Sequence, residues 1–497
     1  KKKERRKPYQ SGGKLQKQSI NLSECLRMIR KNSQETIAPY LKDASNYSGG
    51  VAKEVLIPEN LVEIVEFLKN DLRPVTIAGA GTGLSASRIP SEGVIISLER
   101  FDEIETVENG EVWLGPAATL TELQEHLKNS GWFYPPNPTE TNASIGGTLA
   151  TNASGSRSYK YGVTRNFIQA VECILADGRK VLLKRGHKIS DPLCMDDGSN
   201  ISFPEIVYTS PNCKNTAGYF VQPEMDWLDL FIGSDGTLGI FVRICLRLIS
   251  KPTAFLSGVL FFNNEKSCWE LTSEIKSKSS VSPCSLEYFD RFSLDILREK
   301  FPNIPLKAQA ALFFEEDVSA QENYNAKFDD WIKFLTGKNI LLDDSWFSQN
   351  ENDNATFHDF RHKIPVIINE KNARAGREKI GTDMAVSDKY FMEMMNFYEK
   401  TLSNTGIPYA IFGHLGDNHL HVNLLPQPSQ KELADSLYGE IARKIISWNG
   451  TVAAEHGIGK IKKKYFHEMV GKKSIEELKA IKNILDPQMR LGRGNIF

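Results

Sequence analysis

Three histidines lie within eight residues of one another, although the chain of 497 residues has only nine. They are His414, His419 and His421, and the same stretch carries Asp417 and Asn423. A neutral imidazole is a common ligand of divalent metals. An isolated histidine is more often an ordinary core residue, so it is the convergence of three that favours a metal site.

The residues around these histidines predict a β-hairpin that gathers them in one place. An apolar strand leads to His414, Gly-Asp-Asn forms a turn, and residues 419–424 return as a second strand. Alternate residues of a strand share a face, so His419, His421 and Asn423 are expected to line a cavity. His414, at the end of the first strand, is expected to reach the same cavity.

A carboxylate that could complete the site lies further along the chain. Glu455 stands beside His456 in the run Ala-Ala-Glu-His-Gly-Ile-Gly. Two histidines and one carboxylate typically hold a catalytic divalent metal and leave one coordination position open. The metal site is therefore interpreted as a catalytic one.

A second group of residues indicates a binding loop for a large phosphorylated ligand. Of the 28 residues from 135 to 162, 21 are Gly, Ala, Ser, Thr, Asn or Pro. A loop of this length in a compact domain is usually functional or disordered, and the aromatic residues and the strand that flank it argue against disorder. Small residues permit close approach of the backbone, and their hydroxyl and amide groups can bind a pyrophosphate and a polar ring.

A glycine-rich turn earlier in the chain fits the same purpose. Gly79, Gly81 and Gly83 follow a predicted strand, as they would in a dinucleotide-binding Rossmann motif. That motif is excluded because Leu84 stands where its third glycine belongs, and because a strand at 94–98 follows instead of a helix. The turn is interpreted as a nest of backbone N–H groups that can bind an anion.

Helices and strands must position these residues, and their predicted order along the chain alternates too irregularly for a (β/α)8 barrel. The order instead predicts two α+β domains that meet near Pro252. Helices are expected over residues 21–45, from Pro58 onward, at 264–280 and at 320–336. Strands are expected at 75–78, 94–98, 111–114, 170–176, 239–249, 255–262 and 308–314.

Composition excludes several classes of protein. The formal net charge is −1, so no global field recruits nucleic acid or an anionic membrane. No apolar run approaches the ~18 residues that span a bilayer. Seven scattered cysteines without a CxxC pair argue against a disulfide framework or a cysteine metal cluster. The expected location is the cytoplasm, with peripheral contact with the inner membrane left open.

Three segments together carry a resemblance to a known family, namely residues 77–98, 135–178 and 233–240. They resemble the FAD-binding domain of the vanillyl-alcohol oxidase type (PCMH-type) flavoproteins, and within it the branch of D-lactate, glycolate and D-2-hydroxyglutarate dehydrogenases. The resemblance implies an α+β fold, with a two-subdomain PCMH-type FAD-binding domain and an α+β substrate (cap) domain containing an antiparallel sheet. The implied parts are a helical lead-in at 1–44, the FAD-binding domain at 45–252, the cap domain with the metal hairpin at 253–447, and a C-terminal segment at 448–497 that returns to the FAD-binding domain.

The resemblance also implies FAD that is bound without a covalent link. Relatives with covalent flavin have a histidine in the first glycine loop, and residues 78–85 of this chain contain none. The implied FAD contacts are Gly79, Ala80, Gly81, Thr82, Gly83, Ser144, Ile145, Gly147, Asn152, Ser154, Gly155, Gly162, Val163, Gly236 and Ile240.

The same resemblance assigns the metal ligands. His414, His421 and Glu455 match the family's ligands for a divalent metal, commonly zinc or manganese. The chain departs from the family at Asn418 and His419, where glycine and asparagine are usual. Three roles stay open for the extra imidazole: a fourth metal ligand, a group that supports the ligands, or a different substrate contact. A second departure is the tail Gly-Arg-Gly-Asn at 492–495, which replaces Asn-Pro-Gly-Lys and puts a flavin contact in doubt.

Catalytic roles follow from the resemblance for four other residues. His456 matches the family's proposed base, and Asn423 matches a substrate contact. Arg361 and Lys379 match positions where a cation is expected, and a guanidinium or ammonium group suits a substrate carboxylate.

The implied activity is FAD-dependent, metal-assisted oxidation of a D-2-hydroxyacid to the 2-oxoacid. Electrons would pass to a separate acceptor, such as a quinone, an electron-transfer flavoprotein or an Fe–S protein, with oxygen as an alternative. A flavin-free metallohydrolase would leave residues 135–162 without a purpose. A non-catalytic FAD-binding electron-transfer subunit would have no use for the histidines, and the non-redox chemistry of the ether-lipid synthase relatives fits the hairpin less well.

Overall fold

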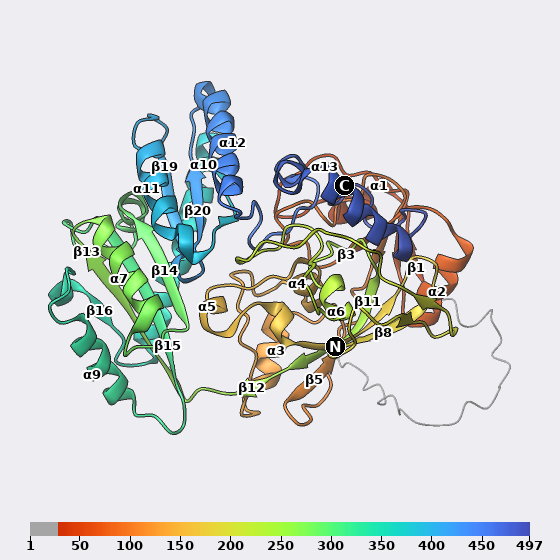
Figure 1. Ribbon diagram of the computed structural model, residues 1–497, viewed down its shortest axis with the longest axis horizontal. Helices are drawn as coiled ribbons and strands as arrows, with labels where there is room; N and C mark the ends of the chain where they lie inside the picture. Colours follow the sequence, from red (N-terminus) through yellow and green to blue (C-terminus); the bar gives the residue numbers. More distant parts are fainter. Residues whose placement is uncertain (1–27) are drawn as a thin grey trace.

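Two four-stranded sheets form the core of the first half of the chain (Figure 1). The computed structural model describes residues 28–497. In the first sheet, three parallel strands are edged by one antiparallel strand in the order β1-β2-β4-β3. Because parallel strands are covered on both faces, β4 is buried along its whole length. The elements are β1 (Ile29–Lys31), β2 (Glu54–Ile57), α2 (Leu61–Asn70), β3 (Val75–Ala78) and β4 (Val94–Ser97).

The second sheet is antiparallel, in the order β5-β11-β7-β8. Its strands are β5 (Glu111–Leu114), β7 (Ile168–Ile174), β8 (Lys180–Lys184) and β11 (Ile240–Arg247). Four helices belong to the same region, namely α3 (Leu120–Leu127), α4 (Ile145–Thr151), α5 (Ser158–Tyr161) and α6 (Trp227–Phe231). Two short strand pairs accompany them, β6 (Trp132–Phe133) with β12 (Ile249–Ser250) and β9 (Leu193–Cys194) with β10 (Asn200–Ile201).

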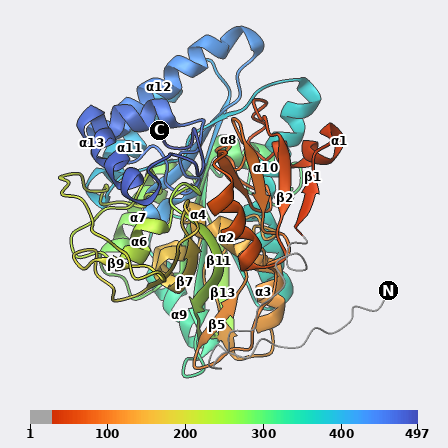
Figure 2. The same cartoon turned by 90° about the vertical axis from the view of Figure 1, so that its right-hand side faces the viewer.

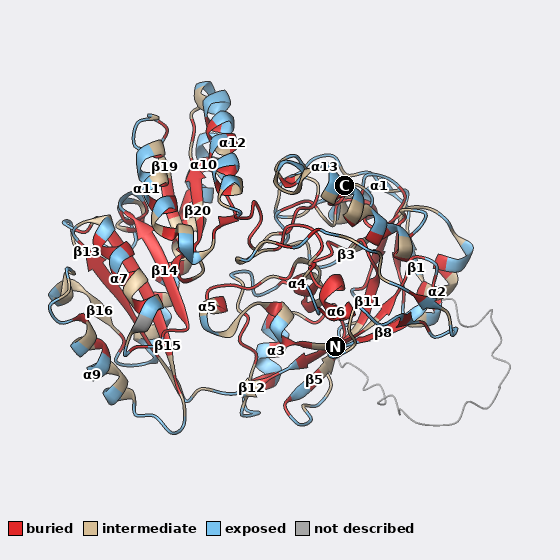
Figure 3. Cartoon of the chain, viewed as in Figure 1, coloured by how far each residue is buried: buried red, intermediate tan, exposed pale blue. Residues whose placement is uncertain are grey.

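A single eight-stranded antiparallel sheet forms the second half, in the order β16-β13-β15-β14-β19-β20-β17, with β18 also paired to β20. Figure 3 shows its strands buried, whereas the helices on its outside present an exposed face. The strands are β13 (Ala254–Phe262), β14 (Ser285–Asp290), β15 (Ala310–Val318), β16 (Trp346–Phe347), β17 (Ile380–Gly381), β18 (Met384–Ala385), β19 (Tyr409–His414) and β20 (His419–Leu424). The helices are α7 (Glu265–Lys278), α8 (Arg291–Leu297), α9 (Tyr324–Leu335), α10 (Glu351–Ala375), α11 (Phe391–Leu402) and α12 (Lys431–Ser447).

The end of the chain returns to the first half. Helix α13 (Lys463–Leu485) lies over the first half in both views (Figures 1 and 2). Its Lys482 donates from Nζ to the carbonyl oxygens of Thr237 at 2.5 Å and Leu491 at 3.1 Å. Leu491 pairs with Val75 in a parallel bridge, so the last residues add to the edge of the first sheet beside β3.

The α+β class and the antiparallel sheet of the second half are confirmed. The strands predicted at 75–78 and 111–114 have the bounds of β3 and β5, and the other predicted strands are present with ends shifted by a few residues. Helices α7 and α9 confirm the helices predicted at 264–280 and 320–336. No helix within residues 28–497 is both long and apolar enough to cross a bilayer.

Three local predictions need correction. The helix expected over residues 21–45 lies partly outside the described residues. Its helical character is confirmed at α1 (Gln34–Ile37) and the 3-10 turn that follows, whereas residues 29–31 form β1 because the exposed edge of β2 offers them hydrogen-bonding partners. The helix expected to open at Pro58 begins at Leu61, where the Asn60 side chain caps it by accepting from Glu63 N at 3.1 Å. The segment 135–162, predicted as a loop, contains α4 and α5.

Candidate active site

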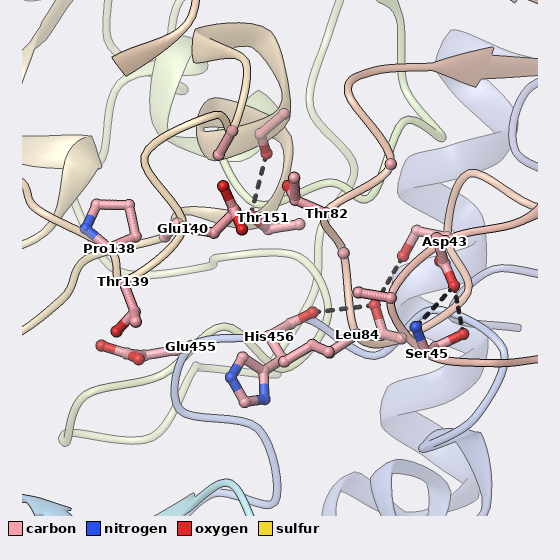
Figure 4. A pocket seen from close by; sticks show the side chains of 18 of the residues that line it. Asp43, Ser45, Thr82, Leu84, Pro138, Thr139, Glu140, Thr151, Glu455 and His456 are labelled. Carbon is pink, nitrogen blue, oxygen red and sulfur yellow. Dashed lines mark hydrogen bonds between the residues drawn. The ribbon is translucent and has the colours of Figure 1, made fainter. Parts of the chain in front are cut away.

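One cavity of about 2110 Å³ is lined by both halves of the molecule. The glycine turn 79–83 and residues of the segment 138–154 border it from the first half. Side chains from β14, α10, β19 and β20 border it from the second half. Figure 4 shows Glu455 and His456 among the lining side chains, together with Thr82 and Thr139 from the two glycine-rich segments. The two groups of residues singled out in the sequence thus face one chamber.

The glycine turn forms a cradle of backbone that side chains would fill. An ideal Cβ on Gly79 would lie 3.0 Å from Ser144 Oγ, so the turn lies directly against the start of α4. Ser144 Oγ in turn accepts from Gly147 N at 3.3 Å and caps that helix. A Cβ on Gly83 would meet no atom within 4 Å, because Gly83 faces open space. A cradle of this kind fits the phosphate-bearing part of FAD.

The predicted FAD contacts divide into two groups. Those that line the cavity are Gly79, Ala80, Gly81, Thr82, Gly83, Ser144, Gly147, Ser154 and Gly236. Those outside its lining are Ile145, Asn152, Gly155, Gly162, Val163 and Ile240. Members of the second group support their neighbours instead; for example, Asn152 Oδ1 accepts from Arg165 N at 2.9 Å. Contact of either group with FAD stays a prediction.

The hairpin brings the histidines together through its register. His414 is directly opposite His419, and Phe412 is opposite His421, in the antiparallel pair β19–β20. One ligand atom from each of His414, His419, His421 and Glu455 can be chosen so that all lie within 4.8 Å of one another. This donor set of imidazole and carboxylate groups fits a divalent metal.

Two of the rings are held by their Nδ1 atoms. His421 Nδ1 lies 3.0 Å from the Thr382 carbonyl oxygen, to which it can donate, leaving Nε2 free as a ligand. His414 Nδ1 lies 2.6 Å from Glu287 Oε1, and its Nε2 lies 3.3 Å from Glu455 Oε2. Burial opposes charge on His414, but the Glu287 and Glu455 carboxylates prevail and raise its pKa to about 9. The site therefore favours positive charge at this point.

His419, the histidine that departs from the family pattern, is completely buried. Its Nε2 lies 3.0 Å from Asp383 Oδ1, although not in good hydrogen-bonding alignment. Its ring centroid lies 4.6 Å from that of His421. Burial lowers the pKa of both rings to about 4, which keeps them in the neutral form that binds metals.

Asp383 also supports His456. Asp383 accepts hydrogen bonds from the backbone N–H groups of Glu455 at 3.1 Å and His456 at 3.0 Å, and Oδ2 lies 3.3 Å from His456 Nδ1. Lys462 forms an ion pair with the same carboxylate. Burial lowers the pKa of His456 to about 4, so its ring is neutral at neutral pH. The ring stacks on that of His421, with centroids 5.6 Å apart.

Glu455 is fixed by groups from the first half of the chain. Its Oε1 accepts from Ser154 Oγ at 2.6 Å and from Gly155 N at 3.0 Å, and it lies 2.6 Å from Lys214 Nζ. Lys214 also pairs with Asp417 Oδ2 at 3.2 Å. Although burial works in the opposite direction, His414 and Lys214 hold the pKa of Glu455 well below its usual range. Only Oε2 is left to serve as a ligand.

The predicted cations lie on the second-half side of the cavity. Arg361, on α10, has its Nε 3.1 Å from Glu287 Oε2, and the same glutamate holds His414. Lys379, just before β17, lines the cavity and has no carboxylate of residues 28–497 within 4.0 Å; burial lowers its pKa. Asn423 also lines the cavity and donates to the His421 carbonyl oxygen at 3.1 Å.

Three supporting residues were not predicted from the sequence: Lys214, Glu287 and Asp383. Each is a charged residue with no recognisable motif around it in the sequence, and each comes from a different part of the fold. No spacing pattern marks them, because their role depends on which residues they face across the cavity.

Two family models match the chain. The model for the C-terminal domain of FAD linked oxidases covers residues 251–496, and the model for an FAD binding domain covers residues 56–183. The fold is that of a two-part flavoprotein, and its two parts share one cavity. The chain belongs to the FAD-linked oxidase family with a PCMH-type FAD-binding domain.

Known proteins similar to the chain include an oxidase subunit and two dehydrogenases. It is 26% identical to "Glycolate oxidase subunit GlcD" of Bacillus subtilis, with 92% of each chain covered. It is 25% identical to "D-lactate dehydrogenase" of Anaerostipes hadrus, with 90% of each covered. It is 23% identical to "D-2-hydroxyglutarate dehydrogenase" of Stutzerimonas stutzeri, covering 93% of this chain and 95% of that one.

The fold also matches that of solved structures. An alkyldihydroxyacetonephosphate synthase structure superposes with a TM-score of 0.65 at 14% identity, over 93% of this chain and 82% of that one. This likeness concerns the fold, in which an FAD-binding domain is followed by a domain with a large antiparallel sheet.

Proposed function

We propose that the chain oxidises a D-2-hydroxyacid to the corresponding 2-oxoacid with FAD and a divalent metal. The observation that carries the proposal is the single cavity shared by the glycine cradle and the histidine–glutamate cluster. The candidate substrates are D-lactate-like acids, glycolate and D-2-hydroxyglutarate, which correspond to the names of similar proteins.

The cluster would hold the metal and the cradle would hold FAD without a covalent bond. We assign His414, His421 and Glu455 as ligands of zinc or manganese, with His419 as a further candidate. Bound metal would supply Lewis acidity that lowers the pKa of the substrate hydroxyl, and bound FAD would supply the acceptor for the hydride of C2.

Three residues are proposed to bind and orient the substrate. Arg361 and Lys379 would bind the carboxylate, the first through its forked donors and the second as a point charge. Lys379 has no carboxylate partner among residues 28–497, so a substrate carboxylate would offset the unfavourable burial of its charge. Asn423, beside His421 in the cavity, would donate to or accept from a substrate oxygen.

His456 is proposed as the general base that takes the hydroxyl proton. Its pKa of about 4 keeps it unprotonated at neutral pH, as a base must be before reaction. The Asp383 carboxylate, 3.3 Å from Nδ1, would stabilise the ring once Nε2 has accepted the proton. Positioned proton transfer of this kind typically contributes ~10²–10⁴ in rate.

The reduced cofactor must then be reoxidised by a separate partner. We propose a quinone, an electron-transfer flavoprotein or an Fe–S protein as acceptor, and the cytoplasm as the location. The chain's seven scattered cysteines do not form an iron–sulfur motif of their own.

Anaerobic bleaching of the flavin by a panel of D- and L-2-hydroxyacids, with and without a chelator, tests the proposal. D-acids are expected to bleach the flavin, and chelation is expected to stop them. Bleaching by L-acids, or bleaching that chelation leaves unchanged, would contradict the metal-assisted mechanism. A purified protein without flavin absorbance would instead favour a metallohydrolase, and full activity of His421→Ala would favour a non-catalytic subunit.

A further inference from the structure

Arg88 is a charged residue of the cavity that the proposed chemistry does not use. It lies in the segment between β3 and β4 that follows the glycine turn, and its side chain lines the cavity. The backbone around it is fixed, since Ile89 N donates to Ala86 O at 3.2 Å and Lys460 N donates to Ser85 O at 2.9 Å. These hydrogen bonds fix the backbone from which the Arg88 side chain extends.

The guanidinium lies against the glycine turn itself. An ideal Cβ on Gly81 would stand 2.1 Å from Arg88 Nη1 and 3.2 Å from Cζ, so only glycine leaves room for the side chain. Gly81 also has a φ of 83°, which an L-residue seldom adopts. Arg88 Cζ stands 6.0 Å from the centroid of the Tyr40 ring. The missing Cβ of Gly81 thus leaves space for the Arg88 side chain beside the backbone of the turn.

Arg88 forms no ion pair within the described part of the chain. Within residues 28–497, no carboxylate lies within 4.0 Å of the guanidinium, and its buried Nε has no hydrogen-bond partner. Two acidic groups stand nearby without forming an ion pair with it. Asp43 Oδ1 accepts from Ser45 N at 2.9 Å, while its Oδ2 is buried without a partner among residues 28–497, and Glu99 Oε2 accepts from Tyr40 Oη at 2.8 Å. A half-buried guanidinium without a partner is unfavourable, so the site is suited to an anion that arrives with a ligand.

We infer that Arg88 binds the diphosphate of FAD through its forked N–H donors, beside the backbone N–H groups of the glycine turn. The inference rests on the FAD-binding part of the proposed function. A diphosphate carries negative charge on oxygens that two N–H donors of a guanidinium can bind together, and it is the only anionic part of FAD. The flavin ring must instead lie toward His456 and the metal ligands if hydride transfer is to occur.

Binding of FAD and of two probes to the apoprotein tests the inference. Arg88→Met is expected to weaken binding of FAD and of ADP by about ten- to hundredfold, as loss of a charged hydrogen-bonded pair does. Binding of adenosine, which lacks the diphosphate, is expected to change less than twofold. Arg88→Lys retains the charge without the fork and should give an intermediate loss. Arg100→Ala is the matched control, because Arg100 belongs to the same region but pairs with Glu59 outside the cavity.

The outcomes separate this inference from the proposed function. If the unaltered protein binds no FAD, the proposed function fails first. If the unaltered protein binds FAD, and Arg88→Met binds FAD and ADP as tightly as the unaltered protein does, the inference about Arg88 fails while the proposed function stands. A loss that falls equally on adenosine would also overturn it. If Arg88 only balanced the charge of Asp43, the double variant Asp43→Asn with Arg88→Met would recover FAD binding, whereas we expect no recovery.

Discussion

Lys214 Nζ lies 2.6 Å from Oε1 of Glu455, so a cation from the FAD-binding half occupies one oxygen of a carboxylate that we assign to the metal. The other oxygen, Oε2, faces His414 at 3.3 Å. Ser154 and Gly155 donate to Oε1 as well. The arrangement fixes the carboxylate in one orientation and couples the position of a metal ligand to the cofactor-binding half.

We expect Lys214→Met to weaken metal binding by roughly 10–100-fold, as the loss of a group that orients a ligand does. The variant leaves two partly buried carboxylates, Asp417 and Glu455, without the buried cation between them, so stability should fall by roughly 3–5 kcal/mol. The metal dissociation constant, measured on protein shown to be folded, checks the prediction. Lys188→Met is the control, since Lys188 pairs with Asp226 while remaining half-exposed. Unchanged metal affinity in Lys214→Met would show that Lys214 is not needed to orient the Glu455 carboxylate.

His419 and His421 should differ in how much metal affinity each supplies. His421→Ala removes a ligand whose Nε2 is left free by the bond at Nδ1, so bound metal should be lost almost entirely. His419 Nε2 faces Asp383, which favours a supporting role, and His419→Asn should cost roughly 10–100-fold. Metal content and affinity by mass spectrometry and titration distinguish the two. Both variants should retain FAD, and equal loss in both would make His419 a full ligand.

Asp383→Asn should slow the reaction while leaving substrate affinity nearly unchanged. The neutral amide cannot stabilise a protonated His456 ring, so kcat is expected to fall by about 10²–10⁴. The substitution also leaves Lys462 without its anion. The double variant Asp383→Asn with Lys462→Met separates the loss of the carboxylate beside His456 from the effect of an unpaired Lys462. It removes the unpaired lysine charge, but His456 still lacks a carboxylate to stabilise its protonated ring. Single-turnover flavin reduction is the measurement, and a rate within twofold of the unaltered protein would rule out the assigned role of Asp383.

The histidine hairpin was predictable because its signal is local. A period of two along residues 419–424 decides which side chains share a face, and the Gly-Asp-Asn turn fixes the return. Asn418 adopts a φ of 53° there, as a turn asparagine can. The geometry of the cluster therefore depends little on distant parts of the chain.

The supporting shell of the site has no such local signal. Asp383 acts on His456 only because the link between β17 and β18 meets the loop between α12 and α13. Helix α10, which carries Arg361, does have a local signal, because its buried residues Phe357, Phe360, Ile364 and Ile367 follow helical spacing. The sequence at the start of α4 favours a loop because Gly146 and Gly147 are poor helix formers, but the Ser144 cap and packing override that preference.

Asp290 should make the stability of the protein depend on pH. It caps α8 by accepting from Ser293 N at 2.8 Å through Oδ1, and its Oδ2 is buried without a partner among residues 28–497. Burial, and secondly the nearby Glu265, raise its pKa to about 8. The folded protein therefore holds a proton on Asp290 that the unfolded chain, with a pKa near 4, releases.

The sign follows from this difference in proton binding. Between pH 4 and pH 8 the folded state binds more protons than the unfolded state, so the free energy of unfolding should fall as pH rises, by up to about 1.4 kcal/mol per pH unit from this group. Asp290→Asn keeps the cap but cannot ionise, and should flatten that part of the profile. Denaturant unfolding at several pH values measures it. Asp295→Asn, on the exposed face of the same helix, should leave the slope as it is. A profile unchanged in Asp290→Asn would mean that Asp290 is ionised in the folded protein.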